Sequence, residues 1–147
     1  MSLKENLAQD LKLSMKEKDI VRKNTVQGIR AAILQTEKDN RTELDDQGII
    51  EVIAKELKKR KDVLPEYEKS GREDLITQLN REIEIVMGYL PSQLSEDELD
   101  EIVKAAVEST GASSKKDMGK VMAAVMPKVK GRADGKLVNK LASKYLM

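Results

Sequence analysis

Apolar residues recur at helical spacing from one end of the chain to the other, and no segment alternates with the period of two that a half-buried strand requires. The first stripe is Leu3, Leu7, Leu11 and Met15. A stripe of this kind lies along one face of a helix and packs against a neighbouring helix. Of the 147 residues only 3 are proline and only 3 are aromatic, which also favours helices over strands. We therefore expect an all-α fold.

Seven segments carry the helical pattern, and turn residues separate them. Four segments before Pro91 are predicted to form a helical bundle, with Ile20 among its apolar positions. Pro65 falls inside the third helix and is expected to kink or break it, because proline lacks an N–H donor and clashes with the preceding turn. Gly71 is the expected end of that helix.

Pro91 and Ser92 mark the predicted boundary between two domains, 1–91 and 92–147. The second domain is predicted to contain three short helices. Ser95 with Glu98 and Ser114 with Asp117 have the spacing of capping boxes, in which each side chain bonds the backbone of the other residue. Pro127 is expected to end the middle helix. Asp134 is the expected N-cap of the last helix.

Charge is distributed unevenly along the chain. The totals of 27 basic and 26 acidic residues give a net charge of only +1. Residues 93–111 contain six acidic side chains and one lysine, whereas residues 112–147 contain nine basic and two acidic side chains. The neutral average therefore hides an acidic segment followed by a strongly basic one.

The basic segment forms an ordered pattern. Lys136, Lys140 and Lys144 recur every four residues and form one ridge on the last predicted helix. Lysine matches phosphate in charge without reading bases, and with almost no aromatic side chains to stack on bases the natural ligand is the backbone of a folded RNA. Two other interpretations stay open: an ordinary solvated lysine face, and a face neutralised by the acidic segment 93–111.

The segment from Gly131 to Lys136 departs from a Walker A loop, because only three residues separate its glycines and Leu137 follows the lysine. We expect Gly131 and Gly135 to permit the turn into the last helix, and they could also let RNA approach the backbone closely.

Composition excludes several kinds of active site. The chain has no His and no Cys, which removes an imidazole base, a thiolate nucleophile and a Cys or His zinc site. Acidic pairs such as Asp97 and Glu101 are typical of a solvated helix face. We expect no catalytic residue, metal or cofactor. The chain has no apolar run long enough to span a membrane and no secretory signal pattern at its start, so we expect a cytoplasmic protein without a membrane partner.

Three stretches, Tyr89 to Ser95, Gly111 to Met122 and Met126 to Asn139, strongly resemble the YqeY family of small bacterial proteins. That family is similar to the C-terminal region of GatB, a subunit of the glutamine-dependent aspartyl/glutamyl-tRNA amidotransferase. The resemblance implies that residues 92–147 are a tail domain of the GatB/YqeY type. It also implies a tRNA-binding accessory module without an active site of its own.

The resemblance and the charge pattern together predict the RNA-contacting residues, which are Lys115, Lys116, Lys120, Lys128, Lys130, Gly131, Arg132, Gly135, Lys136, Lys140 and Lys144. tRNA is the expected ligand. Two alternatives accompany this expectation. One is a protein-interaction adaptor for an aminoacyl-tRNA synthetase or an amidotransferase. The other is a carbon–nitrogen ligase activity with glutamine as amide donor, which the resemblance to GatB would imply.

Overall fold

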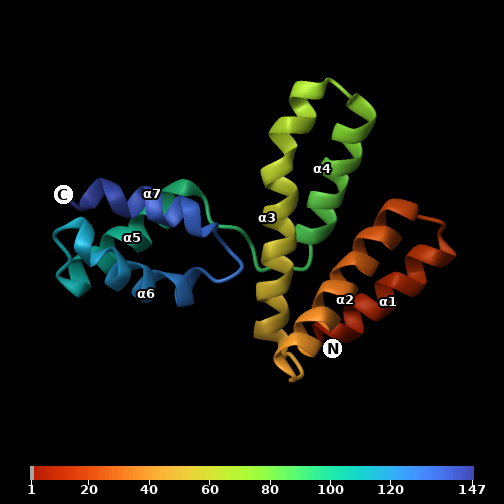
Figure 1. The fold of residues 1–147 in the computed structure, drawn as a ribbon, viewed down its shortest axis with the longest axis horizontal. Coiled ribbons are helices and arrows are strands. Elements are labelled where there is room, and N and C mark those ends of the chain that lie inside the picture. The colour runs from red at the N-terminus through yellow and green to blue at the C-terminus, as the bar shows by residue number, and fades with distance from the viewer. Residues whose placement is uncertain (1) are drawn as a thin grey trace. The chain divides into compact units, whose positions relative to one another are not determined.

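The protein is built of α-helices joined by short turns (Figure 1). A computed structural model describes residues 2–147, and no strand occurs in that range. The helices are α1 (Leu3–Lys16), α2 (Ile20–Asn40), α3 (Asp46–Ser70), α4 (Glu73–Met87), α5 (Glu96–Thr110), α6 (Met118–Val129) and α7 (Gly135–Tyr145), with a short 3₁₀ helix, η1 (Lys115–Asp117), before α6. The predicted all-α fold, with four N-terminal and three C-terminal helices, is confirmed.

The chain divides into two compact units, each with its own hydrophobic core. The N-terminal unit ends at Pro91 and consists of two helical hairpins, α1–α2 and α3–α4 (Figure 1). Its core takes buried side chains from all four helices, among them Leu7, Ile29, Ile53 and Val86. The hairpins are held together because each helix buries one apolar stripe against the others.

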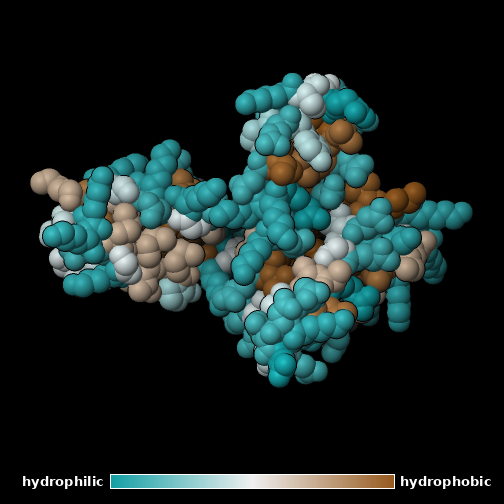
Figure 2. Space-filling view, in the orientation of Figure 1, coloured by the Kyte–Doolittle hydropathy of each residue, from teal (hydrophilic) through white to brown (hydrophobic). Residues whose placement is uncertain are grey.

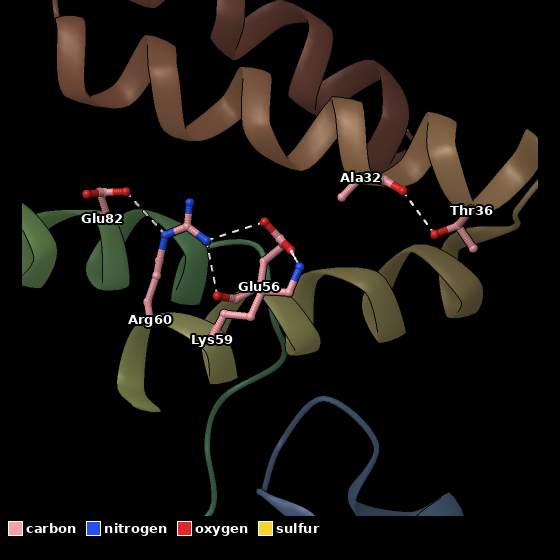
Figure 3. A network of polar contacts seen from close by, with 6 residues as sticks. All are labelled: Ala32, Thr36, Glu56, Lys59, Arg60 and Glu82. Carbon is pink, nitrogen blue, oxygen red and sulfur yellow. Dashed lines mark hydrogen bonds and ion pairs between the residues drawn. The ribbon is translucent and has the colours of Figure 1, made fainter. Parts of the chain in front are cut away.

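Arg60 joins α3 to α4 by polar contacts (Figure 3). Its Nε donates to Glu82 Oε1 on α4 at 3.3 Å, and its Nη1 donates to the Glu56 carbonyl oxygen at 3.1 Å. Only 16% of the Arg60 side chain is exposed. A guanidinium so far removed from water needs these acceptors, because an uncompensated buried charge is strongly destabilising.

A second polar group ties the end of α4 to the first hairpin. Tyr89 donates its hydroxyl hydrogen to the Asp10 carboxylate on α1, and Arg81 Nη2 donates to Asp19 Oδ2 at 2.7 Å. Burial raises the pKa of the Tyr89 phenol, and the hydrogen bond to Asp10 raises it further. These contacts tie α4 and the residues that follow it to α1 and to the start of α2.

Two residues predicted to lie in the core are exposed instead. Met15 is 50% and Ile20 67% exposed. Each step of four residues along a helix overshoots a full turn by about 40°, so Met15 has rotated away from the face of Leu3. Ser14, three residues after Leu11, takes the buried position, and its hydroxyl donates to the Leu11 carbonyl oxygen at 2.8 Å.

The predicted effects of two prolines are also corrected. Helix α3 continues through Pro65 to Ser70, and α6 continues through Pro127 to Val129. Both prolines are exposed, so the carbonyl oxygens that lose an N–H partner lie where water can replace it. Fully buried Val129 holds the last turn of α6 against the core. Gly71, with φ of +70°, ends α3 as expected.

The C-terminal unit runs from Ser92 to Met147, and in it α5 packs against both α6 and α7. Leu99, Val103, Val125 and Leu141 are fully buried at its centre. The predicted capping box of Ser95 and Glu98 and the predicted Asp134 N-cap are confirmed, with Asp134 accepting a hydrogen bond from the Lys136 amide at 3.0 Å. Local signals at the helix ends thus set where α5 and α7 begin.

Candidate nucleic-acid interface

The turn that leads into α7 is fixed by the segment preceding α5. Gln93 Nε2 donates to the Gly131 carbonyl oxygen at 2.7 Å, and the Leu94 amide donates to the Arg132 carbonyl oxygen at 2.9 Å. Gly131 itself has φ of +73°, a conformation that glycine adopts without strain. The conformation of the turn is therefore fixed both by hydrogen bonds from residues 93 and 94 and by the backbone of Gly131 itself.

The two glycines of this turn have different roles. Gly135 has no positive φ and is simply the first residue of α7, so the expectation that both glycines permit the turn is corrected to Gly131 alone. A Cβ at Gly135 would meet only Met126 Cε, at the ordinary contact distance of 3.8 Å.

Arg132 holds the turn in place. Its Nε donates to the Ser92 carbonyl oxygen at 3.0 Å, which links the turn to the first residue of the unit. Its charge also contributes to a lowered pKa of the Glu98 carboxyl, although hydrogen bonds from Ser95 are the main cause. At least part of the Arg132 guanidinium is thus engaged within the protein.

The lysines of α7 form the exposed row that the spacing predicts. Lys136, Lys140 and Lys144 are all exposed, while Val138 and Leu141 on the other side of the helix are fully buried. At 1.5 Å per residue, successive lysines of this row start about 6 Å apart along the helix axis. The packing of α7 therefore directs three positive charges to solvent on one side.

Main-chain bonds bring two further lysines to the end of this row. The Met147 amide donates to the Ser113 carbonyl oxygen at 3.3 Å, and the Lys115 amide donates to the Met147 carbonyl oxygen at 3.2 Å. Lys115 and Lys116 are exposed in η1, which these bonds place at the end of α7 that carries Lys144. Five of the predicted residues are thus exposed either on α7 or in the short helix bonded to its C-terminal end.

The remaining predicted lysines lie on or just after α6. Lys120 is 68% exposed and 3.9 Å from Asp117 Oδ1, a pair too long and too open to water to contribute much. Lys128 is exposed in the last turn of α6, and Lys130 is half-buried at its end. Lys128 and Lys130 are near the fixed turn, at the end of the unit where α7 begins.

Three acidic residues of α5 lie on the face that points away from α6 and α7. Asp97, Glu101 and Glu108 are exposed, and helical spacing places them opposite buried Leu99 and Val103. The acidic segment and the lysine row thus occupy different sides of the unit. Asp100 is the acidic residue that contacts α7, where its Oδ2 accepts from the Tyr145 hydroxyl at 2.8 Å.

One side of α6 is uncharged. Met122 and Met126 are half-buried there, and Ala123 is exposed. Figure 2 shows this surface as a weakly hydrophobic band over α6, with hydrophilic side chains around it. The lysines of the unit therefore border a patch of modest apolar character.

Within residues 2–147 no group of three or more His, Cys, Asp or Glu side chains is arranged to hold a metal ion. In the same range no helix is long and apolar enough to cross a bilayer. What the surface offers chemically is positive charge and hydrogen-bond donors on a rigid frame.

Sequence reasoning missed Gln93 and Ser92, which position the turn. Their partners, Gly131 and Arg132, lie 38 and 40 residues away in the sequence. A lone glutamine in a linker carries no pattern that would indicate such a partner, so only the folded arrangement identifies it.

Comparisons with known proteins identify a family and several relatives of this chain. The family described as Yqey-like protein matches residues 4–146. Altered inheritance of mitochondria protein 41 from Pyrenophora tritici-repentis is 33% identical over 138 residues, which cover 91% of this chain and 75% of the relative. The proteins of the same name from Kluyveromyces lactis and Lachancea thermotolerans are 39% and 38% identical over 84 and 86 residues. Those matches cover 56% and 58% of this chain and 45% and 46% of the relatives, so the chain spans about half of their length.

These names correct the expectation of a cytoplasmic protein. All three relatives are named as mitochondrial proteins, which contradicts that expectation. The expectation used the lack of a basic segment followed by an apolar run, and that pattern reports on secretion rather than on targeting to an organelle.

Proposed function

The chain belongs to the YqeY-like family, and from this premise we propose that it is a non-catalytic accessory module that binds structured RNA, with tRNA as its ligand. The observation that carries the proposal is the exposed row of Lys136, Lys140 and Lys144 on α7, extended at one end by Lys115 and Lys116. Phosphates bind such a row through charge and release counterions as they do so.

The chemistry of the surface favours recognition of the RNA backbone over its bases. Tyr145 is the one aromatic side chain of the C-terminal unit, and it is half-buried with its hydroxyl bonded to Asp100. Base stacking on aromatic rings therefore has no platform here. Lysines on a fixed helix suit a folded RNA, whose phosphates also have fixed positions.

The turn before α7 supports the same proposal. Hydrogen bonds from Gln93 and Leu94 hold it in one conformation before any ligand arrives. A surface that is already ordered loses less conformational entropy when it binds. Lys136, the first lysine of the row, follows directly after this turn.

Titration of labelled tRNA with the intact protein at several salt concentrations tests the proposal. The variant Lys136→Gln, Lys140→Gln, Lys144→Gln removes three charges from α7. If all three contact phosphate, the slope of log K against log salt becomes less steep by about 2–3, since each contact contributes about 0.7–0.9.

A matched control removes the same charge from the N-terminal unit. Lys55→Gln, Lys58→Gln, Lys61→Gln changes three exposed lysines of α3, and it should leave both the affinity and the slope unchanged. The proposal fails if the wild-type protein does not bind tRNA at low salt, or if the two triple variants behave alike.

One observation favours a second function, an adaptor that docks on an aminoacyl-tRNA synthetase or an amidotransferase. The uncharged side of α6, with Met122, Ala123 and Met126, has the adaptable apolar character of a protein-binding surface. Co-purification of such an enzyme after RNase treatment, and its loss in Met122→Gln, Met126→Gln, would support the adaptor over the RNA module.

A further inference from the structure

The turn between α1 and α2 exposes an unusual amount of apolar surface. Leu13 and Met15 on α1 are each 50% exposed, and Ile20 on α2 is 67% exposed. Large apolar side chains this open to water occur at few other positions in residues 2–147, and here three lie within eight residues. Figure 2 shows hydrophobic side chains exposed at this end of the hairpin.

The backbone accounts for this exposure. Glu17, Lys18 and Asp19 form the turn that joins the two antiparallel helices at one end of the hairpin (Figure 1). Side chains on a helix lean towards its N-terminus, so Ile20, the first residue of α2, leans out towards the turn. Leu13 and Met15 lie in the last turns of α1, on either side of buried Ser14.

Lysines lie among these apolar groups, because helical spacing places Lys12 and Lys16 between Leu13 and Met15 on the outer face of α1. Lys12, Lys16 and Lys18 are all exposed in the same stretch. The same stretch contains two acidic residues, Glu17, which is exposed, and Asp19, which is bonded to Arg81 at 2.7 Å and is 3.6 Å from the Arg22 Nε. Counting these two arginines with the three lysines, basic side chains at the turn outnumber the acidic ones by five to two.

From this arrangement we propose that the α1–α2 turn docks on an anionic lipid surface, with Leu13, Met15 and Ile20 entering the interface and the three lysines meeting the headgroups. Exposed apolar side chains beside lysines supply both attractions of an interfacial membrane contact, which are burial of apolar area and attraction to anionic headgroups. The aliphatic stems of the lysines can lie along the apolar groups while their ammonium groups stay among the headgroups.

The other partners fit this turn less well. Leucine, methionine and isoleucine offer RNA neither stacking nor hydrogen bonds, so they would add nothing to phosphate binding. A stable protein interface needs about 800 Å² on each side with good shape complementarity, and a protruding turn of a few residues offers little of that area. A bilayer surface, in contrast, can deform to fit a protruding turn.

The exposed turn changes two expectations drawn from the sequence. We expected no membrane partner because no apolar run is long enough to span a bilayer, and we expected Met15 and Ile20 to lie in the core. At this turn both side chains are exposed instead. The contact would be at the surface of the bilayer, consistent with the lack of a spanning helix in residues 2–147.

Co-sedimentation of the full chain with vesicles tests the proposal. The protein should bind vesicles that contain phosphatidylglycerol and should bind pure phosphatidylcholine vesicles much more weakly. Two variants separate the contributions. Leu13→Gln, Met15→Gln, Ile20→Gln should lower binding at least about tenfold. Lys12→Gln, Lys16→Gln, Lys18→Asn should lower it about a hundredfold, and asparagine tolerates the backbone of residue 18.

Matched controls change similar residues elsewhere. Leu34→Gln alters a leucine that is 52% exposed in α2, far along the helix from the turn, and it should bind vesicles like the wild type. Lys55→Gln, Lys58→Gln, Lys61→Gln should do the same for charge. Because all the substituted side chains are exposed, none of the variants should melt below the wild type, and thermal unfolding therefore separates loss of binding from loss of fold.

Four results would overturn the proposal. They are no sedimentation with anionic vesicles, equal losses in the turn variants and their controls, a change of oligomeric state in the apolar variant, and loss of tRNA affinity in the turn variants. The α7 lysine variant should keep its vesicle binding, so failure of this proposal and failure of the RNA proposal give different patterns.

Discussion

Gly131 is a position where the backbone permits little choice. Its φ of +73° costs a residue with a side chain about 1–2 kcal/mol. We expect Gly131→Ala to lower the free energy of unfolding of the C-terminal unit by about that amount, measured by chemical denaturation. Gly135→Ala is the control, because Gly135 is helical and has room for a Cβ. Equal effects of the two substitutions would show that the left-handed turn is not the cause.

Tyr89 gives the N-terminal unit an alkaline pH dependence. Its pKa is raised above the ordinary 10.0 in the folded state, by burial first and then by Asp10. Above pH 10 the Tyr89 phenol loses its proton in the unfolded chain but keeps it in the folded chain. The free energy of unfolding therefore falls as the pH rises.

Tyr89→Phe should remove that dependence. Near neutral pH the variant is expected to be less stable by about 1.5 kcal/mol, because the Asp10 carboxylate loses a donor. Above pH 10 the difference from the wild type should shrink. Denaturation curves across this range provide the measurement, and a difference that stays constant would contradict the explanation.

Signals that act over a few residues could be predicted from the sequence. Ser95 and Asp134 cap their helices as expected, because an N-cap bonds an amide only two or three residues ahead. The role of Gln93 could not be predicted, because its acceptor is 38 residues away and depends on how α5 and α7 pack. Residue patterns thus predicted where the charged side chains lie. The contacts that hold the neighbouring turn in place could be identified only in the folded structure.

The helices show where a sequence rule is overridden. A proline inside a helix removes one hydrogen bond, yet α3 continues for five residues past Pro65. Residues 65–70 are exposed, so solvent satisfies the free carbonyl oxygen, and Gly71 provides the stop. The proline was visible in the sequence, whereas the exposure that makes it tolerable was not.

Pro65→Ala should therefore stabilise α3. Alanine restores the N–H donor to the Lys61 carbonyl oxygen and removes a helix penalty of up to about 3 kcal/mol. We expect a gain of about 1 kcal/mol or more in the free energy of unfolding of the N-terminal unit, and slower amide exchange in residues 61–70. A loss of stability instead would mean that the proline ring makes a contact that the helix needs.

The chain as a whole contains two separate hydrophobic cores. A destabilising substitution in one core should therefore loosen that unit and leave the other unit stable. Leu141 is fully buried in the C-terminal core. Leu141→Ala should cost about 2–5 kcal/mol there, which is much of what a unit of 56 residues can have. Hydrogen exchange should speed up within residues 92–147 and stay unchanged in the core of α1 to α4. Faster exchange throughout the chain would show that the two cores unfold together.

The uneven charge of the chain was the most useful property visible before folding. It located the basic segment, and helical spacing located the row on α7. The exposed apolar surface of the α1–α2 turn could not be predicted because Met15 and Ile20 match helical stripes, and only their exposure of 50% and 67% in the fold separates them from the core.

Lys18 has a left-handed backbone, with φ of +58°, which a lysine adopts at a conformational cost that glycine would avoid. Replacing it with glycine should raise the thermal midpoint while removing one charge from the turn. An engineer selecting only for heat resistance would make that exchange. The resulting protein would unfold at a higher temperature. If the turn binds anionic lipid, the same protein would bind that lipid more weakly. At this position a thermal screen and a lipid-binding assay would rank the same two residues in opposite order.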